Sequence, residues 1–200
     1  DLTLDSRFEN YLGYALKGST LKGTLNVSSN HLNLNDFMSA DTTAAVAEVP
    51  ADTAAMGVIR VPENIDFQMQ AAFRELLFDK MTLTDGKGTL LVRNGTVDMR
   101  NLSFNTMGGS VTMNGAYAAP QNKQPELNAA FNMRNISFAQ AYQDLGLVQQ
   151  LAPIFAGLKG NFSGNLQIDT PLDATMSPVM SAVQGKGALS TKDLSLSGVK

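Results

Sequence analysis

Apolar residues alternate with polar ones through most of this chain, and this two-residue period constrains the fold more than any other feature of the sequence. Residues 94–118, NGTVDMRNLSFNTMGGSVTMNGAYA, show it clearly, with apolar side chains at Val97 and Met99 and again at Leu102 and Phe104. Successive side chains of a β-strand point to opposite faces, so the pattern predicts strands with one apolar and one polar face. Asn-Gly and Gly-Gly steps between the runs are typical of turns or bends. The sequence therefore predicts an all-β protein.

The apolar phase shifts by one residue at several points in the alternation. Such shifts occur between Val27 and Leu32, between Met99 and Leu102, and between Met133 and Ile136. One extra residue, a β-bulge, would bend a strand while keeping its apolar side chains on one face. Alternatively, each shift marks a tight turn between two separate strands. Both interpretations predict a curved antiparallel sheet of hairpins, arranged as an open groove or half-barrel or as a sandwich-like pair of sheets.

Two segments interrupt the alternation and divide the chain. Residues 39–57, SADTTAAVAEVPADTAAMG, are rich in Ala, Thr and Asp and have few apolar side chains to bury, which predicts a mobile loop. The second segment is 137–157. We expect a central β-meander over 58–136, between the two segments, and further β-hairpins over 158–200.

Residues 137–157, SFAQAYQDLGLVQQLAPIFAG, have the period of a helix. Ser137 and Gln140 have the spacing of a capping box. Apolar residues then recur on one helical face, at Phe138, Ala141, Tyr142, Leu145 and Val148. Pro153 should end or kink the helix. The pattern predicts one short amphipathic helix around residues 138–151.

Composition argues against several classes of function. Charged residues make up only 16% of the chain and the net charge is −3, so it lacks the concentrated basic stripe of a nucleic-acid-binding protein. The chain contains no Cys, and His31 is its only histidine. Metal ligation needs several His, Cys or clustered carboxylates, and none of these groupings is present in the sequence. We therefore predict no catalytic residue, no metal and no cofactor, and a non-enzymatic protein.

The chain resembles the AsmA-like family of Gram-negative envelope proteins, in particular the versions from Bacteroidetes. The resemblance is carried by VSSNHLNLNDFM (27–38) and by VPENIDFQMQAAFRELLFDKMTLTDGKGTLLVRNGTVDMRNLSFNTMGGSVTMNGAY (61–117). LAPIFAGLKGNFSGNLQI and MSPVMSAVQGKGALSTKDLSLSG extend it over most of the chain. It implies a large protein that is anchored in the inner membrane and projects into the periplasm. Its β-sheet would curl into an open groove, as in TamB-like and bridge-like lipid transfer proteins.

The resemblance also implies a function, namely movement of phospholipid, or of another acyl-chain lipid, between the inner and outer membranes, or a contribution to outer-membrane assembly. Because the chain begins and ends within predicted strands, we expect residues 1–200 to be a fragment of one larger β-groove domain whose membrane anchor lies elsewhere. Asp52-Thr53-Ala54, in the predicted loop, resembles the short O-glycosylation motif of Bacteroidetes envelope proteins, which makes Thr53 a candidate acceptor.

Nine apolar residues of the alternating runs are the candidate lipid-facing residues: Phe67, Met69, Val97, Met99, Phe104, Val111, Met113, Phe131 and Met133. Polar neighbours such as Asp66, Gln68, Asp98 and Thr112 should face water. A filled β-sandwich produces the same alternation, so a structural or adhesive β-repeat domain is the first alternative. A surface carbohydrate-active enzyme is the second, and it would need a pair of carboxylates in a cleft.

Overall fold

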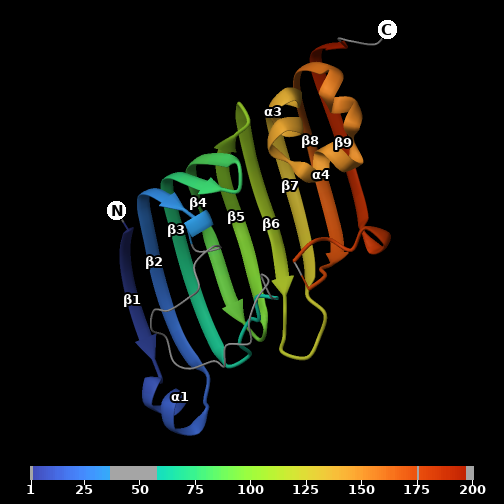
Figure 1. Ribbon diagram of the computed structural model, residues 1–200. Coiled ribbons are helices and arrows are strands. Elements are labelled where there is room, and N and C mark those ends of the chain that lie inside the picture. Colours follow the sequence, from blue (N-terminus) through green and yellow to red (C-terminus); the bar gives the residue numbers. More distant parts are fainter. Residues whose placement is uncertain (1, 37–57, 175, 197–200) are drawn as a thin grey trace.

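The computed structural model describes residues 2–36, 58–174 and 176–196, which form one curved nine-stranded β-sheet whose strands follow chain order (Figure 1). The strands are β1 (Leu2–Glu9), β2 (Leu21–Asn33), β3 (Ile65–Phe78), β4 (Met81–Arg93), β5 (Thr96–Thr106), β6 (Gly109–Ala118), β7 (Glu126–Ser137), β8 (Leu158–Pro171) and β9 (Gln184–Leu196). The predicted all-β class and the curved sheet are confirmed. The predicted mobile loop, residues 39–57, lies outside the described residues.

One pair of neighbouring strands departs from the expected hairpin arrangement. Seven of the eight neighbouring pairs are antiparallel, whereas β2 and β3 are parallel. Parallel neighbours start at the same end of the sheet, so the chain between them must return along its whole length. The prediction of a sheet made entirely of hairpins is therefore wrong at β2 and β3.

Asn residues in the left-handed conformation produce the phase shifts in β5 and β7. Asn101 has a φ of 49°, and the pairing of β5 with β6 gains one extra β5 residue between Met99 and Leu102. Asn135, with a φ of 56°, marks the equivalent shift in the pairing of β7 with β8. Asn adopts this conformation more readily than most residues with a side chain. The bulge interpretation is therefore confirmed at these two shifts.

The two Asn-Gly steps have different roles. Asn94 and Gly95 both have positive φ, 51° and 73°, and they form the two-residue turn between β4 and β5. Asn114-Gly115 lies inside β6, so the expectation of a turn or bend there is wrong. The Asn114 side-chain oxygen accepts a hydrogen bond of 2.8 Å from the backbone N–H of the bulged Asn101. The second Asn therefore satisfies a donor that the bulge removes from the ladder.

The predicted amphipathic helix begins where expected but is interrupted. Helices α3 (Phe138–Asp144) and α4 (Gly146–Leu151) are separated by Leu145, which has an extended conformation, and a 3₁₀ turn, η1 (Pro153–Gly157), follows. The Ser137 hydroxyl accepts from the Gln140 N–H, as the capping-box spacing predicts. Gly146 is a weak helix former, which helps to explain the break at Leu145. The prediction of a single helix is therefore wrong in its continuity.

Two short elements were not predicted. Helix α1 (Tyr11–Lys17) follows β1, and its last turn is closed by Gly18 at a φ of 63°. A 3₁₀ turn, η2 (Met180–Ala182), precedes β9. Neither has enough residues to show a helical period in the sequence.

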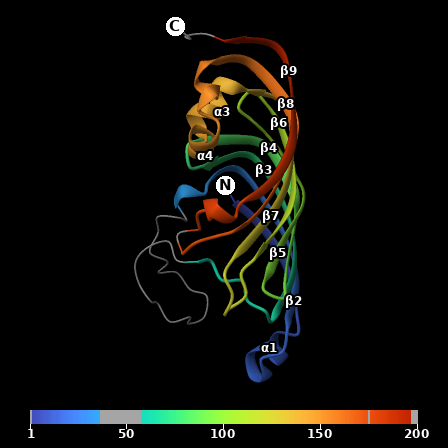
Figure 2. The same ribbon diagram turned by 90° about the vertical axis from the view of Figure 1, so that its right-hand side faces the viewer.

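A packed cluster of buried apolar residues lies at one corner of the sheet. It consists of Val111, Ile136, Phe138, Ala141 and Phe162, where α3 contacts β7 and β8. Phe138 is fully buried and its ring lies 4.8 Å from those of Phe155 and Phe162. Figures 1 and 2 show α3 and α4 on one side of the sheet, near the upper ends of β7–β9, and the sheet curves toward that side.

Candidate functional site

The ladder register shows that the nine candidate apolar residues share one face of the sheet. Residues that are paired directly across two strands point to the same face. The pairings form four rows: Phe67, Val92, Val97 and Tyr117; Met69, Leu90, Met99 and Gly115; Leu102, Met113, Phe131 and Leu166; and Phe104, Val111, Met133 and Gly164. Strand β6, which contains no positive-φ residue, contributes one residue to each row and so connects them. The polar neighbours Asp66, Gln68, Asp98 and Thr112 lie on the opposite face.

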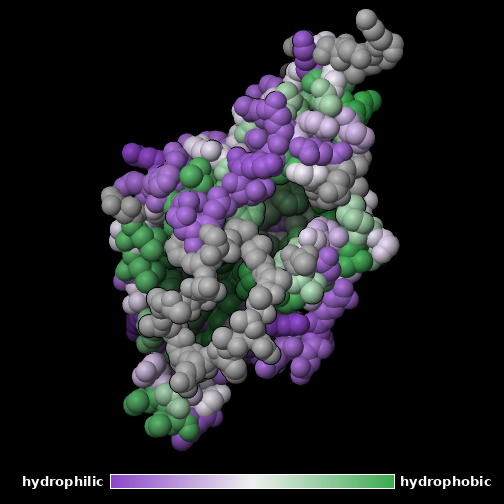
Figure 3. All heavy atoms as spheres, viewed as in Figure 1, coloured by the Kyte–Doolittle hydropathy of each residue, from purple (hydrophilic) through white to green (hydrophobic). Residues whose placement is uncertain are grey.

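This apolar face is the concave one. Phe138 and Ala141 of α3 pack against Val111, and Phe104 and Met133 are partly buried against the same cluster. Since α3 lies on the side toward which the sheet curves, the apolar face looks into the hollow (Figure 2). Figure 3 shows hydrophobic residues at the floor of this hollow and mainly hydrophilic residues along its upper rim.

Most of the concave face is not packed as a core. Eight of the nine candidate residues are half-buried, and only Val111, beneath α3, is buried, at 6% exposure. In the part of the chain that the structure describes, there is one sheet, and the helices cover it only near β7 and β8. The apolar side chains of β2–β5 therefore have no second apolar layer among the described residues.

The apolar face continues to both edges of the sheet. On β1, Leu2 and Leu4 are each 57% exposed and Phe8 is 52% exposed, and on β9 Leu189 is 51% exposed. With neighbouring strands about 4.8 Å apart, the nine strands span about 38 Å. The apolar concave face thus extends from β1 to β9, and it forms an open trough where the helices near β7 and β8 do not cover it.

Several residues of this face were missed by the sequence-based prediction. Leu90, Leu91 and Val92 are consecutive apolar residues, so alternation could not assign their faces. The register places Leu90 and Val92 on the concave face beside Met99 and Val97, and Leu91 on the opposite face. Only the pairing with neighbouring strands could resolve this run.

Glycines on the concave face make room for large side chains of the neighbouring strand. Gly23 is paired with both Phe8 and Phe67, and a Cβ there would lie 3.2 Å from each ring. A Cβ on Gly86 would overlap the ring of Phe73. These are the glycines of the recurring Lys-Gly and Gly-Lys-Gly steps in the sequence. The steps therefore serve side-chain packing within the sheet.

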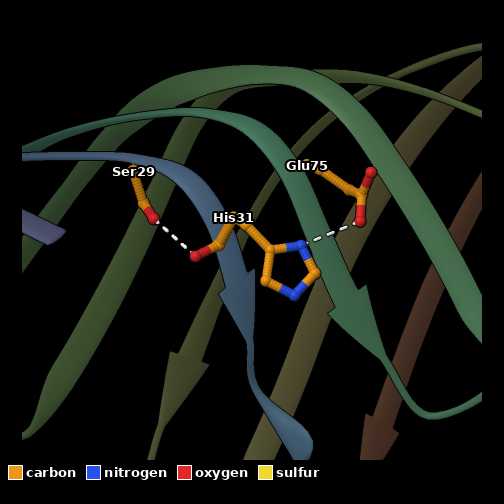
Figure 4. Close-up of polar contacts among 3 residues, drawn as sticks. All are labelled: Ser29, His31 and Glu75. Carbon is orange, nitrogen blue, oxygen red and sulfur yellow. Dashed lines mark hydrogen bonds and ion pairs between the residues drawn. The ribbon is translucent and has the colours of Figure 1, made fainter. Parts of the chain in front are cut away.

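The His31 ring pairs with a carboxylate and not with the neighbouring Ser29 hydroxyl. Its Nδ1 lies 2.9 Å from a carboxylate oxygen of Glu75, and the side chains are 57% and 44% exposed (Figure 4). The Ser29 hydroxyl donates to the backbone carbonyl of His31, not to its ring. A nucleophilic Ser would need its hydroxyl on the imidazole. The pair instead joins the parallel strands β2 and β3 at the surface.

Tyr117 brings a hydroxyl to the end of the apolar face. It donates to the backbone carbonyl of Ile59 at 2.7 Å. Burial raises the pKa of Tyr117 above its ordinary value, and the nearby Arg60 guanidinium partly offsets this effect. The hydroxyl is therefore neutral at physiological pH and adds no charge to the trough.

Two further features, a metal site and a membrane-spanning helix, are absent from the described residues. No group of three or more His, Cys, Asp or Glu side chains in residues 2–36, 58–174 and 176–196 could hold a metal ion. Over the same ranges, no helix is both long and apolar enough to cross a lipid bilayer.

Comparison of the chain with family models, curated proteins and solved structures found no match. The fold and the apolar trough are thus the observations on which a functional proposal can be built.

Proposed function

We propose that this chain is a non-enzymatic segment of an AsmA-like envelope protein and that its concave face carries the acyl chains of phospholipids. The observation that supports this proposal is the apolar concave face itself, which is only half-buried in the middle of the sheet and reaches both edges. In this proposal the segment lies in the periplasm, on a protein anchored in the inner membrane, and contributes to phospholipid transport to the outer membrane or to its assembly.

The energetics of lipid movement suit such a surface. Moving a 16-carbon acyl chain from a bilayer into water costs about 12 kcal/mol, at about 0.8 kcal/mol per methylene group. Polar contacts, at a net contribution of about 1 kcal/mol each, cannot replace this solvation. A continuous apolar surface can, and the methionines at positions 69, 99, 113 and 133 add flexible side chains that adapt to a moving chain.

The core beneath α3 is the observation that favours the alternative, a structural β-domain with a filled core. There, Ile136 and Phe138 are buried as completely as in any packed domain. A filled core would require this packing to continue over β3–β5, where the candidate residues are half-buried. The two functions therefore predict different effects on lipid binding and on stability when a charge is introduced on that part of the face.

A charge placed on the concave face distinguishes the two functions. Met99→Asp and Met113→Asp each put a carboxylate on the trough floor. In an open trough the carboxylate stays hydrated until a lipid must displace its water, which costs about 3 kcal/mol. We expect photo-crosslinking of the purified chain to phospholipid to fall about a hundredfold, with the melting temperature nearly unchanged.

The matched control is Thr112→Asp, which places the same charge one residue from Met113 but on the opposite face. It should leave both crosslinking and melting temperature unchanged. Collapse of the melting temperature in Met99→Asp, together with no lipid bound by the parent chain, would reject the trough and leave the structural domain.

A further inference from the structure

The convex face of the sheet, on the side away from α3, carries a polar hollow over β6–β9 (Figure 2). The volume of this hollow is about 850 Å³, which is within the range of small-molecule sites in proteins. Two rows of paired side chains line it, Thr112–Asn132–Asn165 and Ala130–Gln167–Lys186. Residues paired across a ladder share a face, and Thr112 lies opposite the trough. The hollow is therefore separate from the apolar face.

The lining of the hollow offers hydrogen-bonding groups that no described residue uses. Asn132, Asn165 and Gln167 each present an amide, which both donates and accepts. All three side chains are exposed, and none makes a hydrogen bond to another described residue. Thr112 and Ser110 add hydroxyl groups beside them. A ligand with several hydroxyl groups can therefore pair with several of these side chains at once.

Two cationic side chains line the hollow without an acidic partner. Arg134 and Lys186 are exposed and form no ion pair with a described residue, and no described Asp or Glu lines the hollow. Elsewhere on the convex face, by contrast, the Arg100 guanidinium lies 3.8 Å from the carboxylate of Asp98. The net charge of the chain is −3, so the excess of positive charge here is local. It favours an anionic ligand.

The position of the hollow argues against a peptide or a nucleic acid. An extended peptide binds mainly through main-chain hydrogen bonds to a free strand edge, whereas β7 and β8 are paired on both sides. Single-stranded nucleic acid needs aromatic side chains for base stacking. Phe131 borders the hollow, but it pairs with Met113 and its side chain belongs to the concave face.

We propose that this hollow binds an acidic glycan, a chain of sugar units that carry carboxylate groups. The sugar hydroxyls pair with the amides of Asn132, Asn165 and Gln167, and the carboxylates pair with Arg134 and Lys186. Arg in particular can hold a carboxylate through two parallel hydrogen bonds. The site is open and its polar side chains are exposed, so binding should be weak, with a Kd of about 1 mM.

The first test is a titration with tetragalacturonate, an acidic tetrasaccharide, followed by nitrogen–proton correlation NMR. The side-chain NH₂ signals of Asn132, Asn165 and Gln167 report directly on the hollow. We expect these signals to shift and to saturate, with a Kd of about 1 mM. The absence of a saturable shift up to about 20 mM overturns the proposal.

Two further probes separate the sugar from its charge. Maltotetraose has the hydroxyl groups without the carboxylates, and it should bind at least about tenfold more weakly than tetragalacturonate. Tetraglutamate has carboxylates on a peptide chain without sugar hydroxyls, and it should not shift the three side-chain signals in a saturable way. Equal affinity for either probe and tetragalacturonate overturns the assignment of an acidic glycan.

Variants of the two cations test the placement of the ligand. Arg134→Gln and Lys186→Gln should each weaken tetragalacturonate binding about fivefold or more, because each removes a charge-assisted contact. Both side chains are exposed and unpaired among the described residues, so the melting temperature should not change. The matched control is Arg100→Gln, which removes the same charge from the same face outside the hollow. Equal effects of Arg134→Gln and Arg100→Gln overturn the placement.

The glycan tests do not depend on lipid, because the hollow and the trough lie on opposite faces. Met99→Asp should leave tetragalacturonate binding unchanged, and Arg134→Gln should leave phospholipid crosslinking unchanged. Failure of glycan binding therefore leaves the proposed lipid function in place, and failure of lipid binding leaves the glycan result in place.

Discussion

At the scale of single residues, glycine and asparagine shape this sheet. Glycine on the concave face provides space for an aromatic or aliphatic side chain of the next strand, as Gly86 does for Phe73. Asparagine in the left-handed conformation inserts the extra residue that bends a strand. The polar residues around the bulges then satisfy the displaced backbone groups: the Ser163 hydroxyl accepts from the N–H of Asn135 at 2.9 Å. Residue types that looked featureless in the sequence thus have defined mechanical roles.

Gly86→Ala should destabilise the fold. The new Cβ would overlap the Phe73 ring, and Gly86 is buried between β3 and β5. Overpacking of this kind costs about 1–3 kcal/mol, measurable by urea denaturation. Gly146→Ala is the control, because a Cβ there has no neighbour within 4 Å, and its stability should stay the same or rise slightly. Equal stability of the two variants would contradict the spacing role of Gly86.

Asn101→Ala should cost about 1 kcal/mol, since an Ala side chain is strained in the left-handed conformation. Asn101 is exposed, so little packing is lost with its side chain. Asn101→Gly removes the strain and should be neutral or slightly stabilising. The comparison is made by thermal denaturation, and a Gly variant as unstable as the Ala variant would show that the side chain, not the backbone, holds the bulge.

At the scale of elements, α3 closes one end of an otherwise open sheet. Its cap at Ser137 directs the chain from β7 onto the concave face, where Phe138 inserts between Phe155 and Phe162. The break at Leu145 then lets α4 and η1 turn back over the same corner. The helical segment is therefore a local cover, and the remaining strands depend on their ladders and on the half-buried apolar face.

Phe138→Ala and Phe67→Ala compare the covered and the open parts of that face. Phe138 is fully buried, so its loss should cost about 3–5 kcal/mol. Phe67 is half-buried, so its loss should cost about 1–2 kcal/mol by the transfer free energy of the area it covers. Both changes remove the same atoms, and the free energy of unfolding is the measurement. Equal costs would mean that the face is packed throughout.

At the scale of the whole molecule, the chain exposes more surface than a compact protein of its size. Its accessible surface is 13375 Å², whereas a compact protein of 21.4 kDa exposes about 9,100 Å². A single layer of sheet contributes to the difference, because over most of its area the described residues place no second layer on either face.

The urea dependence of unfolding should reflect this shape. The m-value is proportional to the surface exposed on unfolding. From the same scaling, the chain buries about 18,000 Å² on folding instead of about 22,000 Å², so its m-value should be about a fifth below that of a compact protein of equal length. An m-value equal to the compact one would indicate a filled core in solution.

Sequence alone was sufficient to predict the alternating strands and the phase shifts within them, since these depend on local geometry, although it left bulges and tight turns as alternatives at each shift. The direction of each Cβ follows from the two-residue period, and a one-residue shift of that period at an Asn is typical of a bulge. For the same reason, the nine apolar residues from Phe67 to Met133 could be assigned to one face before any pairing was known. Ser137 and Gln140 likewise marked the start of α3 through their spacing.

Only the tertiary structure decided the features that depend on contacts between distant segments. The parallel pairing of β2 with β3 brings together strands that no tight turn joins, and no local pattern encodes it. The faces of Leu90, Leu91 and Val92 were decided by their ladder partners. A filled sandwich and an open trough require the same alternation. What separates them is whether a second apolar layer meets the face, and that depends on where distant parts of the chain come to lie.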